Sequence, residues 1–274
     1  MGSLHRQRIS NWYYNWCAVC RHGNGCWSFA FRLGRHASSG EIIKRFMNVV
    51  FNAFSKILAI VGKDVITELR TKETVSAMFI FSMWVIFIFN FTFDLRAENV
   101  TILAPGVLWV TIAFTSMLGL GRSFIIEKDR GSLEGLLLTP VDRSVIYLGK
   151  FVSNVLFISL VAIMVLPLFI IFFDQPLEVM PYLVGIIILG IVGLAGVGTL
   201  FSAMVIHTRA RDTLLPILLF PIVVPILLAV VRLTTGVLDN KPSNDLSQWL
   251  GFAVAFDMIF MAISFVLFEY VVEE

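Results

Sequence analysis

Six long apolar runs dominate the sequence and predict six membrane-spanning helices. They cover residues 75–93, 102–121, 145–173, 182–206, 214–231 and 249–272. A helix needs about 20 apolar residues to cross the hydrocarbon core of a bilayer, and each run reaches or approaches that length. The apolar residues are continuous, whereas a soluble amphipathic helix would show them as a stripe. The sequence therefore predicts an all-α membrane protein with six transmembrane helices.

The segment before the first run, 47–74, has a different pattern. It mixes apolar residues such as Phe54 and Leu58 with charged ones such as Lys56, Lys63 and Arg70. This mixture is typical of an amphipathic helix that lies in the membrane interface. The alternative is a cytoplasmic helix that packs on the bundle.

Basic residues are distributed unequally between the two sides of the predicted bundle. One side carries ten lysines and arginines: Lys56, Lys63, Arg70, Lys72, Arg122, Lys128, Arg130, Arg143, Arg209 and Arg211. The other side carries Arg96, Arg232 and Lys241, the last two in a loop predicted over 232–248. Because loops rich in lysine and arginine stay in the cytoplasm, both termini are predicted to be cytoplasmic, or on the matrix or stromal side in an organelle.

Composition excludes a soluble protein. The chain is 58% hydrophobic and 15% charged, with a mean hydropathy of +0.86. A soluble domain of 274 residues would be less apolar. The net charge of +2 gives no reason to expect a nucleic-acid partner.

The first 46 residues differ from the rest of the chain. They contain Cys17, Cys20 and Cys26, which are all the cysteines, and seven basic residues against one acid, Glu41. We interpret residues 1–46 as a non-native or disordered extension, upstream of a natural start at Met47, with no part in the fold. A transit peptide is the alternative. The three cysteines with His22 could bind zinc, but incidental cysteines are favoured, and no metal site is predicted.

A charged segment, EKDRGSLEGLLLTP (127–140), separates the second and third runs. It can present charges to water and leucines to an apolar groove. Its candidate contact residues are Glu127, Lys128, Asp129, Arg130, Gly131, Leu133, Glu134, Leu137 and Pro140. Such a segment suits contact with a soluble partner, and a solvated cytoplasmic loop is the alternative.

Asp257 stands inside the last apolar run, eight residues after Trp249. An ionisable side chain at this depth destabilises the helix unless it has a function or faces a protein interior. A polar site for a ligand path or a partner subunit is one interpretation. A structural hydrogen bond to Asn154, Ser159 or another small polar side chain in the bundle is the other. Asn154 and Asn90 are interpreted as hydrogen-bonding groups between helices.

Glycines and prolines mark two of the predicted spans. The fourth span carries a predicted close-packing face for another span or a second copy of the chain, formed by Gly185, Gly190, Gly193, Gly196 and Gly198. The fifth carries Pro216, Pro221 and Pro225, which predict a kinked helix.

No enzyme active site is apparent in the sequence. It contains no phosphate-binding loop of the G-x-x-x-x-G-K-[ST] type. It also lacks a Ser/His/Asp set, paired carboxylates within a span, and an HExxH motif. If the protein takes part in active transport, the energy must come from another subunit.

Two stretches carry a resemblance to a known family. FIIEKDRGSLEGLLLTPVDRSVIYLGKF (124–151) and DVITELRTKETVSAMFIFSMWVIFIFNFTF (64–93) resemble the haem exporter protein B family, the permease subunit of the cytochrome c maturation system. The resemblance runs from Met47 to the C-terminus. It implies a permease of the ABC-2 type, in which Glu127–Leu138 is a coupling helix, bounded by Gly131 and Pro140, that docks on an ATPase.

The resemblance also implies partners and a location. The partners are a cytoplasmic ATP-binding subunit, other cytochrome c maturation membrane proteins, the lipid bilayer and a second copy of the chain. No cofactor is expected on this subunit, and haem is expected at the level of the complex. A bacterial plasma (inner) membrane is favoured over an organellar inner membrane. Two other functions stay open: an ABC-2 permease for a glycan, lipid or drug, and a non-transporting membrane scaffold.

Overall fold

The structure is a computed structural model that describes residues 39–94, 100–129, 143–173, 177–205, 208, 211–239 and 243–271. The chain divides into two compact units, Met1–Phe54 and Ser55–Glu274. The second unit contains all six predicted spans. The cysteines of the zinc alternative lie outside the described residues, and the interpretation of residues 1–46 as an extension stays a prediction.

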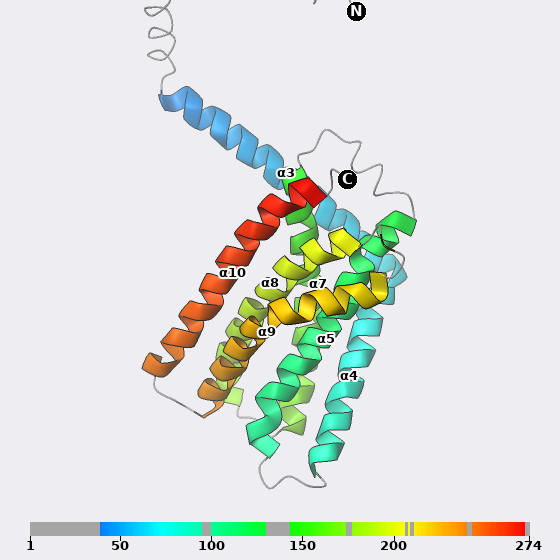
Figure 1. The fold of residues 1–274 in the computed structure, drawn as a ribbon, viewed down its shortest axis with the longest axis vertical. Helices are drawn as coiled ribbons and strands as arrows, with labels where there is room; N and C mark the ends of the chain where they lie inside the picture. Colours follow the sequence, from blue (N-terminus) through cyan, green and yellow to red (C-terminus); the bar gives the residue numbers. More distant parts are fainter. Residues whose placement is uncertain are drawn as a thin grey trace, which may run out of the picture. The chain divides into compact units, whose positions relative to one another are not determined.

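Helices account for nearly all of the described residues, which include no strand. In chain order they are α3 (Ser39–Thr71), α4 (Glu73–Asp94), α5 (Val100–Asp129), α7 (Arg143–Phe172), the 3₁₀-helix η1 (Leu177–Val179), α8 (Met180–Val205), α9 (Arg211–Leu238) and α10 (Ser243–Val271), as Figure 1 shows.

Six of these helices are long and apolar enough to cross a membrane. The candidate spans are Glu73–Thr92, Leu103–Ser123, Arg143–Phe172, Met180–Val205, Thr213–Leu238 and Leu246–Phe268. The prediction of an all-α membrane protein with six spans is therefore confirmed.

Two predicted boundaries were wrong. Helix α3 begins at Ser39, before Met47; a serine followed by Glu41 in the first turn favours a helix start there. Helix α9 continues to Leu238, so Arg232 lies on a helix and not in an external loop. Its buried neighbours Leu233 and Thr234 extend the packed face of α9 past this one exposed charge.

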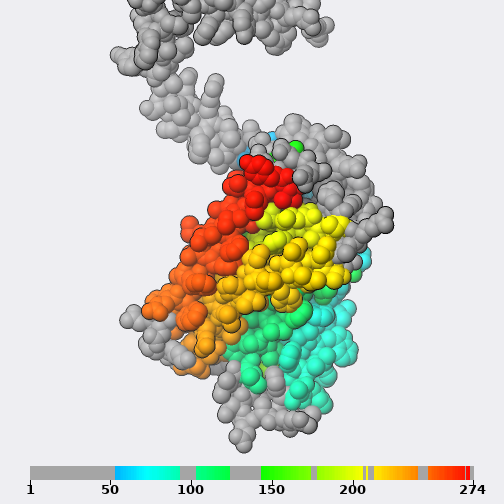
Figure 2. All heavy atoms as spheres, in the orientation of Figure 1, coloured from blue at the N-terminus to red at the C-terminus, as the bar shows by residue number. Residues whose placement is uncertain are grey.

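The spans differ in how much of each is covered by its neighbours. An 18-residue apolar stretch is 72% buried in each of α5 and α8, whereas the corresponding stretch is 22% buried in each of α4 and α10. Helices α5 and α8 are therefore the centre of the bundle, and α4 and α10 lie at its edge. Figure 2 shows the side chains of α10 forming much of one outer surface, beside those of α9.

Helix α9 runs without a break from Arg211 to Leu238 but is not straight. It contains Pro216, Pro221 and Pro225, and it changes direction between its yellow first part and its orange second part in Figure 1. A proline removes a backbone donor and its ring displaces the carbonyl one turn earlier. The predicted kink is present.

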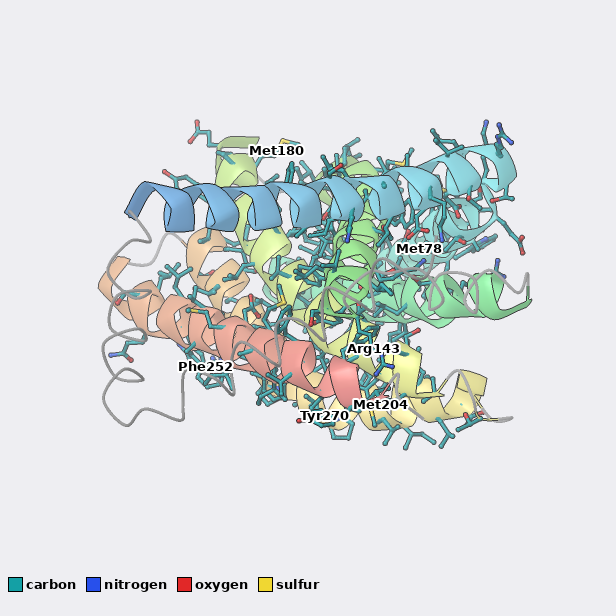
Figure 3. All side chains as sticks on the ribbon, turned by 90° about the horizontal axis from the view of Figure 1, so that it is seen from above. Met78, Arg143, Met180, Met204, Phe252 and Tyr270 are labelled. Carbon is teal, nitrogen blue, oxygen red and sulfur yellow. The ribbon has the colours of Figure 1, made fainter. Side chains whose placement is uncertain are left out.

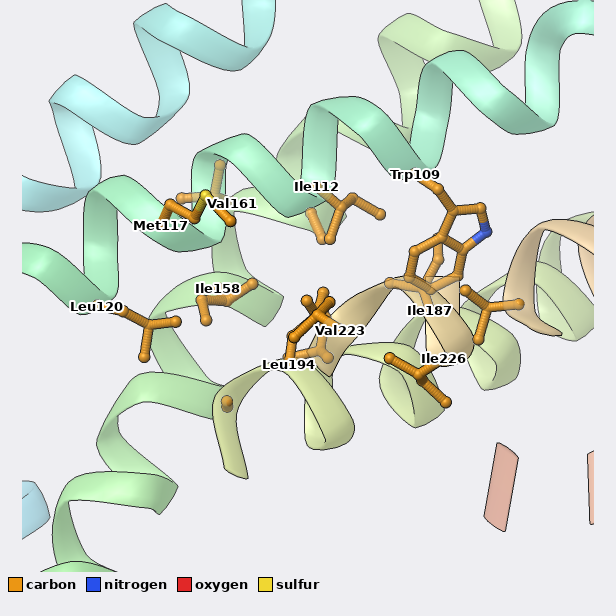
Figure 4. Packing of buried hydrophobic residues seen from close by; sticks show 14 of the residues in the cluster. Trp109, Ile112, Met117, Leu120, Ile158, Val161, Ile187, Leu194, Val223 and Ile226 are labelled. Carbon is orange, nitrogen blue, oxygen red and sulfur yellow. The ribbon is translucent and has the colours of Figure 1, made fainter. Parts of the chain in front are cut away.

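The centre of the core is built around Trp109 of α5. Its indole nitrogen donates a hydrogen bond to Thr234 Oγ1 of α9 at 2.9 Å. Figure 4 shows the ring reaching toward Ile187 of α8 and Ile226 of α9. Gly190 of α8 makes room for it, because a Cβ at that position would overlap the indole ring.

Most of the predicted glycine face packs inside the bundle. Gly193 faces Asp257 and Ile226, and Gly198 faces Leu120, each at a spacing that leaves no room for a Cβ. Gly185 is different, since nothing lies within 4 Å of the position of its Cβ. The glycines of this face from Gly190 to Gly198 therefore pack against other helices of the same chain.

Polar side chains link the helices across the bundle. Asn90 of α4 donates to the Phe172 carbonyl of α7 at 2.8 Å, and Ser202 of α8 donates to the Leu120 carbonyl of α5 at 2.6 Å. Such bonds average about 0.6 kcal/mol each in membrane proteins. The expectation that Asn90 connects two helices is confirmed.

Candidate functional site

The charged segment predicted to contact a soluble partner is flanked by two helices at one end of the bundle. Glu127, Lys128 and Asp129 form the last turn of α5, and α7 begins at Arg143. Arg130, Gly131, Leu133, Glu134, Leu137 and Pro140 lie outside the described residues. Glu127, Lys128 and Asp129 continue α5 and do not begin a separate helix, because no helix breaker precedes Gly131.

Helix α5 extends well past its apolar part. Its candidate span ends at Ser123 and the helix ends at Asp129. Six further residues add about 9 Å at 1.5 Å per residue. Figure 3 views the bundle from the end that carries Arg143 of α7, Met204 of α8 and Tyr270 of α10. Any force on the segment between α5 and α7 reaches the bundle through the ends of these two helices.

The first turns of α7 are tied to α3 by a buried ion pair. Lys150 Nζ lies 2.9 Å from Asp64 Oδ2, and their side chains are 2% and 10% exposed. Lys63 lies further from the same carboxylate, at 3.6 Å from Oδ1. A charge-assisted contact in such a desolvated position is stronger than an exposed one and fixes the geometry of both helices.

The residue before Lys150 brings α3 and α7 into close apolar contact. A Cβ at Gly149 would lie 2.9 Å from Cγ2 of Ile60. Both Gly149 and Ile60 are buried. The glycine and the ion pair together hold the amphipathic helix against the start of α7.

The start of α7 also contacts the centre of the bundle. Tyr147 is fully buried and donates to the Gly196 carbonyl of α8 at 3.0 Å. Its ring centroid lies 5.2 Å from that of Phe268 on α10. The two turns between Arg143 and Lys150 therefore contact α3, α8 and α10.

Helix α3 is joined to α4, and α4 is joined to α5. Glu68 Oε1 accepts a hydrogen bond from the backbone N–H of Val75 at 2.8 Å, near the start of α4. Glu73 in the first turn of α4 pairs with Arg122 of α5 at 3.0 Å. The end of the bundle next to the charged segment is thus a connected set of polar contacts.

Asp257 lies at the midpoint of its span, Leu246–Phe268. It is 8% exposed, and neither carboxylate oxygen has a hydrogen-bond partner among the described residues. Its Oδ1 faces the Cα of Gly193 so closely that a Cβ there would overlap it. The carboxyl group lies against the backbone of α8 without a hydrogen bond to it.

Asn154 does not join Asp257. Its side-chain nitrogen donates to Thr199 Oγ1 of α8 at 2.9 Å. Since neither oxygen of Asp257 has a hydrogen-bond partner within the described part of the chain, the alternative of a structural hydrogen bond to Asn154, Ser159 or another small polar side chain is wrong there. Asn154 is confirmed as an interhelical contact, and an intramembrane polar site at Asp257 stays a prediction.

Sequence reasoning missed the Lys150–Asp64 pair. A lysine six residues into an apolar run, 145–173, is a signal that could have been used, because such a charge needs a partner. The identity of the partner was not readable, since Asp64 is 86 residues away on another helix.

A metal centre finds no support among the described residues. None of their His, Cys, Asp and Glu side chains form a group of three that could hold an ion.

Comparison with known proteins relates this chain to one family, through a family model and through individual relatives. The sequence model of a family described as CcmB protein matches residues 55–270. Heme exporter protein B of Pseudomonas aeruginosa is 25% identical over 199 residues, which cover 73% of this chain and 88% of the relative. Heme exporter protein B of Rhodobacter capsulatus is 24% identical over 170 residues, 62% of this chain and 78% of the relative. Heme exporter protein B of Paracoccus denitrificans is 29% identical over 126 residues, which cover 46% of this chain and 58% of the relative.

Proposed function

The chain belongs to the CcmB protein family, and from this premise we propose that it is a membrane permease subunit of an ABC-type complex in cytochrome c maturation. Its relatives bear the name Heme exporter protein B. In this proposal a separate cytoplasmic subunit hydrolyses ATP. The permease couples that hydrolysis to the handling of haem or to the release of a haem-loaded chaperone, and haem is cargo of the complex.

One observation supports the coupling role most directly. The turns of α7 that follow the charged segment are buried and contact α3 through Lys150, α8 through Tyr147, and α10 through the Tyr147 ring. A displacement of the charged segment would move the start of α7. Because packed interfaces switch between discrete arrangements, a movement of α7 would also move α3, α8 and α10. A loop that only connects two spans would not need such an anchored first turn.

Location and partners follow from the same proposal. The end of the bundle with the charged segment would face the cytoplasm, with both termini on that side and the ATP-binding subunit docked there. The membrane would be the bacterial inner membrane. Other maturation membrane proteins and a second copy of the chain would complete the complex.

The test is co-purification with the cognate ATPase. The full chain is tagged and expressed as wild type and with Glu127, Asp129, Arg130 and Glu134 changed together to alanine. We expect the change to lower ATPase recovery by more than about tenfold, as loss of an interface hot spot does. Holo-cytochrome c formation should fall with it.

The control changes exposed charges elsewhere, Arg70→Ala with Glu178→Ala, and should retain both readouts. If ATPase recovery survives the quadruple change, the segment is not the dock. If the ATPase binds but cytochrome c matures without this chain, the complex is an ABC-2 permease for another substrate. If maturation needs the chain but not the bound ATPase, the protein is a scaffold.

We also propose that Asp257 serves the working cycle and not stability. A buried carboxyl without a hydrogen-bond partner destabilises a fold. Asp257→Asn should therefore leave the melting temperature in detergent unchanged or raised. Holo-cytochrome c formation should fall by about tenfold or more if the carboxyl contacts a ligand path or a partner. A variant that matures cytochrome c normally would assign Asp257 to packing only.

A further inference from the structure

A lateral groove opens between the end of α3, the start of α4 and the middle of α7. Its volume is about 510 Å³, and its lining includes Glu68, Lys72, Ser76, Leu156 and Leu160. All of these residues belong to the second compact unit. Ligand pockets have volumes of roughly 300–1,000 Å³, so the groove is large enough for a small molecule.

The α7 side of the groove is an exposed apolar stripe. Leu156, Leu160 and Ile163 are spaced by four and three residues, so they share one helix face. They are 45%, 48% and 57% exposed although they lie within a candidate span. In a bilayer such side chains face hydrocarbon, so the wall of the groove suits an acyl chain.

The opposite end of the groove carries the exposed cation Lys72 beside the buried acid Glu68. Lys72 lies between α3 and α4 with a φ of 53°, a conformation that residues other than glycine rarely adopt. Its backbone N–H donates to the Glu68 carbonyl at 2.6 Å, and its own carbonyl accepts from Ser76 N–H at 3.2 Å. The junction thus holds an exposed ammonium group immediately before the span that starts at Glu73.

The charges near Lys72 leave its ammonium group available. Glu68 accepts from the backbone of Val75, and Glu73 is paired with Arg122. Among the described residues, Lys72 has no side-chain partner of its own. An anionic headgroup at this level would meet an unpaired cation at the membrane boundary, which attracts anionic lipid.

Two serine hydroxyl groups line the groove. Ser76 and Ser159 both line the groove, and neither hydroxyl has a hydrogen-bond partner within the described part of the chain. A glycerol ester supplies acceptors at the depth between headgroup and acyl chain. Ser76 lies one helical turn past Lys72 and suits that depth, whereas Ser159 lies between Leu156 and Leu160, among the apolar side chains of α7.

A second groove continues the apolar path. It has a volume of about 240 Å³ and lies between α7 and α8, sharing Ser159 and Ile163 with the first. From Leu156 to Leu166, which lines the second groove, α7 rises about 15 Å. That is half of the roughly 30 Å hydrocarbon core, the depth of one leaflet.

The chemistry of the groove favours a lipid over a partner helix as the occupant. An exposed cation stands at the membrane boundary, and exposed aliphatic side chains lie deeper in the span. We propose that the groove binds one anionic glycerophospholipid, with its phosphate beside Lys72 and its acyl chains along α7. The proposal does not rest on the function proposed above.

The headgroup contact is tested by charge reversal. The full chain is purified in mild detergent from membranes that contain phosphatidylglycerol, and bound phospholipid is counted by native mass spectrometry. Lys72→Glu should reduce bound anionic lipid by about fivefold or more. Arg70→Glu, an exposed cation two residues away that does not line the groove, should not. Equal retention by Lys72→Glu and wild type would overturn the headgroup assignment.

The acyl-chain contact is tested by filling the groove. Leu160→Trp should remove bound phospholipid of any charge, whereas Ile171→Trp, on the same helix but outside both grooves and 69% exposed, should not. A photo-crosslinking residue at position 160, in otherwise native sequence, gives a second readout that does not depend on the folding of these variants. A lipid adduct supports the proposal. A protein adduct there, or full lipid retention by Leu160→Trp, overturns it.

Discussion

Replacing Lys150 with methionine is expected to lower the free energy of unfolding by about 3–5 kcal/mol. The change keeps a long unbranched side chain but removes the ammonium group that lies 2.9 Å from Asp64 Oδ2. Asp64 is left as a nearly buried carboxylate whose nearest remaining cation, Lys63, is 3.6 Å away. The measurement is unfolding of the purified chain in mixed micelles titrated with a denaturing detergent.

The same substitution at an exposed ion pair is the control. Arg122 and Glu73 are 3.0 Å apart, but their side chains are 42% and 68% exposed. Arg122→Met should change the unfolding free energy by no more than about 1 kcal/mol, because water screens the pair. Adding Asp64→Leu to Lys150→Met should restore most of the loss, since an apolar pair of similar volume replaces a buried ion pair well. Equal effects of Lys150→Met and Arg122→Met would show that burial of the pair is unimportant.

Gly190→Ala is expected to destabilise the bundle by about 1–3 kcal/mol through overpacking. The new methyl group would overlap the indole of Trp109. That ring cannot rotate away freely, because its N–H is bonded to Thr234 at 2.9 Å and the side chain is 1% exposed. Loss of melting temperature in detergent is the measurement.

The same change at Gly185 provides the comparison. Gly185 belongs to the same helix, but no atom lies within 4 Å of the position of its Cβ. Gly185→Ala should leave the melting temperature unchanged or raise it slightly, since alanine favours the helix over glycine. If both variants melt alike, the contact between Gly190 and Trp109 does not limit packing in the bundle.

The spans were predictable because their signal is local. Each apolar run is long enough to specify one helix by itself, and the number of spans follows from the runs without knowledge of their packing. The class of contact made by Asn90 was also predictable, because an amide in a span needs a partner. Its partner, the Phe172 carbonyl 82 residues away, depends on which helices lie side by side, and no local pattern encodes that.

Residues whose roles depend on tertiary contact were not predictable. Arg232 was taken as part of a loop because one arginine interrupts an apolar run, but the packing of Leu233 and Thr234 extends the helix past it. Lys72 gave no signal for its positive φ, because glycine and asparagine are the usual residues in that conformation. The charged segment was identified from sequence, and its contact with an ATPase stays a prediction.

The bond between Trp109 and Thr234 sets a time scale for making the protein. Thr234 follows Trp109 by 125 residues in the chain. At about 5–20 residues per second, the indole N–H waits about 6–25 s after its synthesis for its acceptor to be added. Helix α8 ends at Val205, so α5 lacks α8 during the first part of that interval and lacks a complete α9 until its end. The speed of the ribosome therefore determines how long the unfinished bundle exposes its central helix, and slow codons between α5 and α9 would lengthen that exposure.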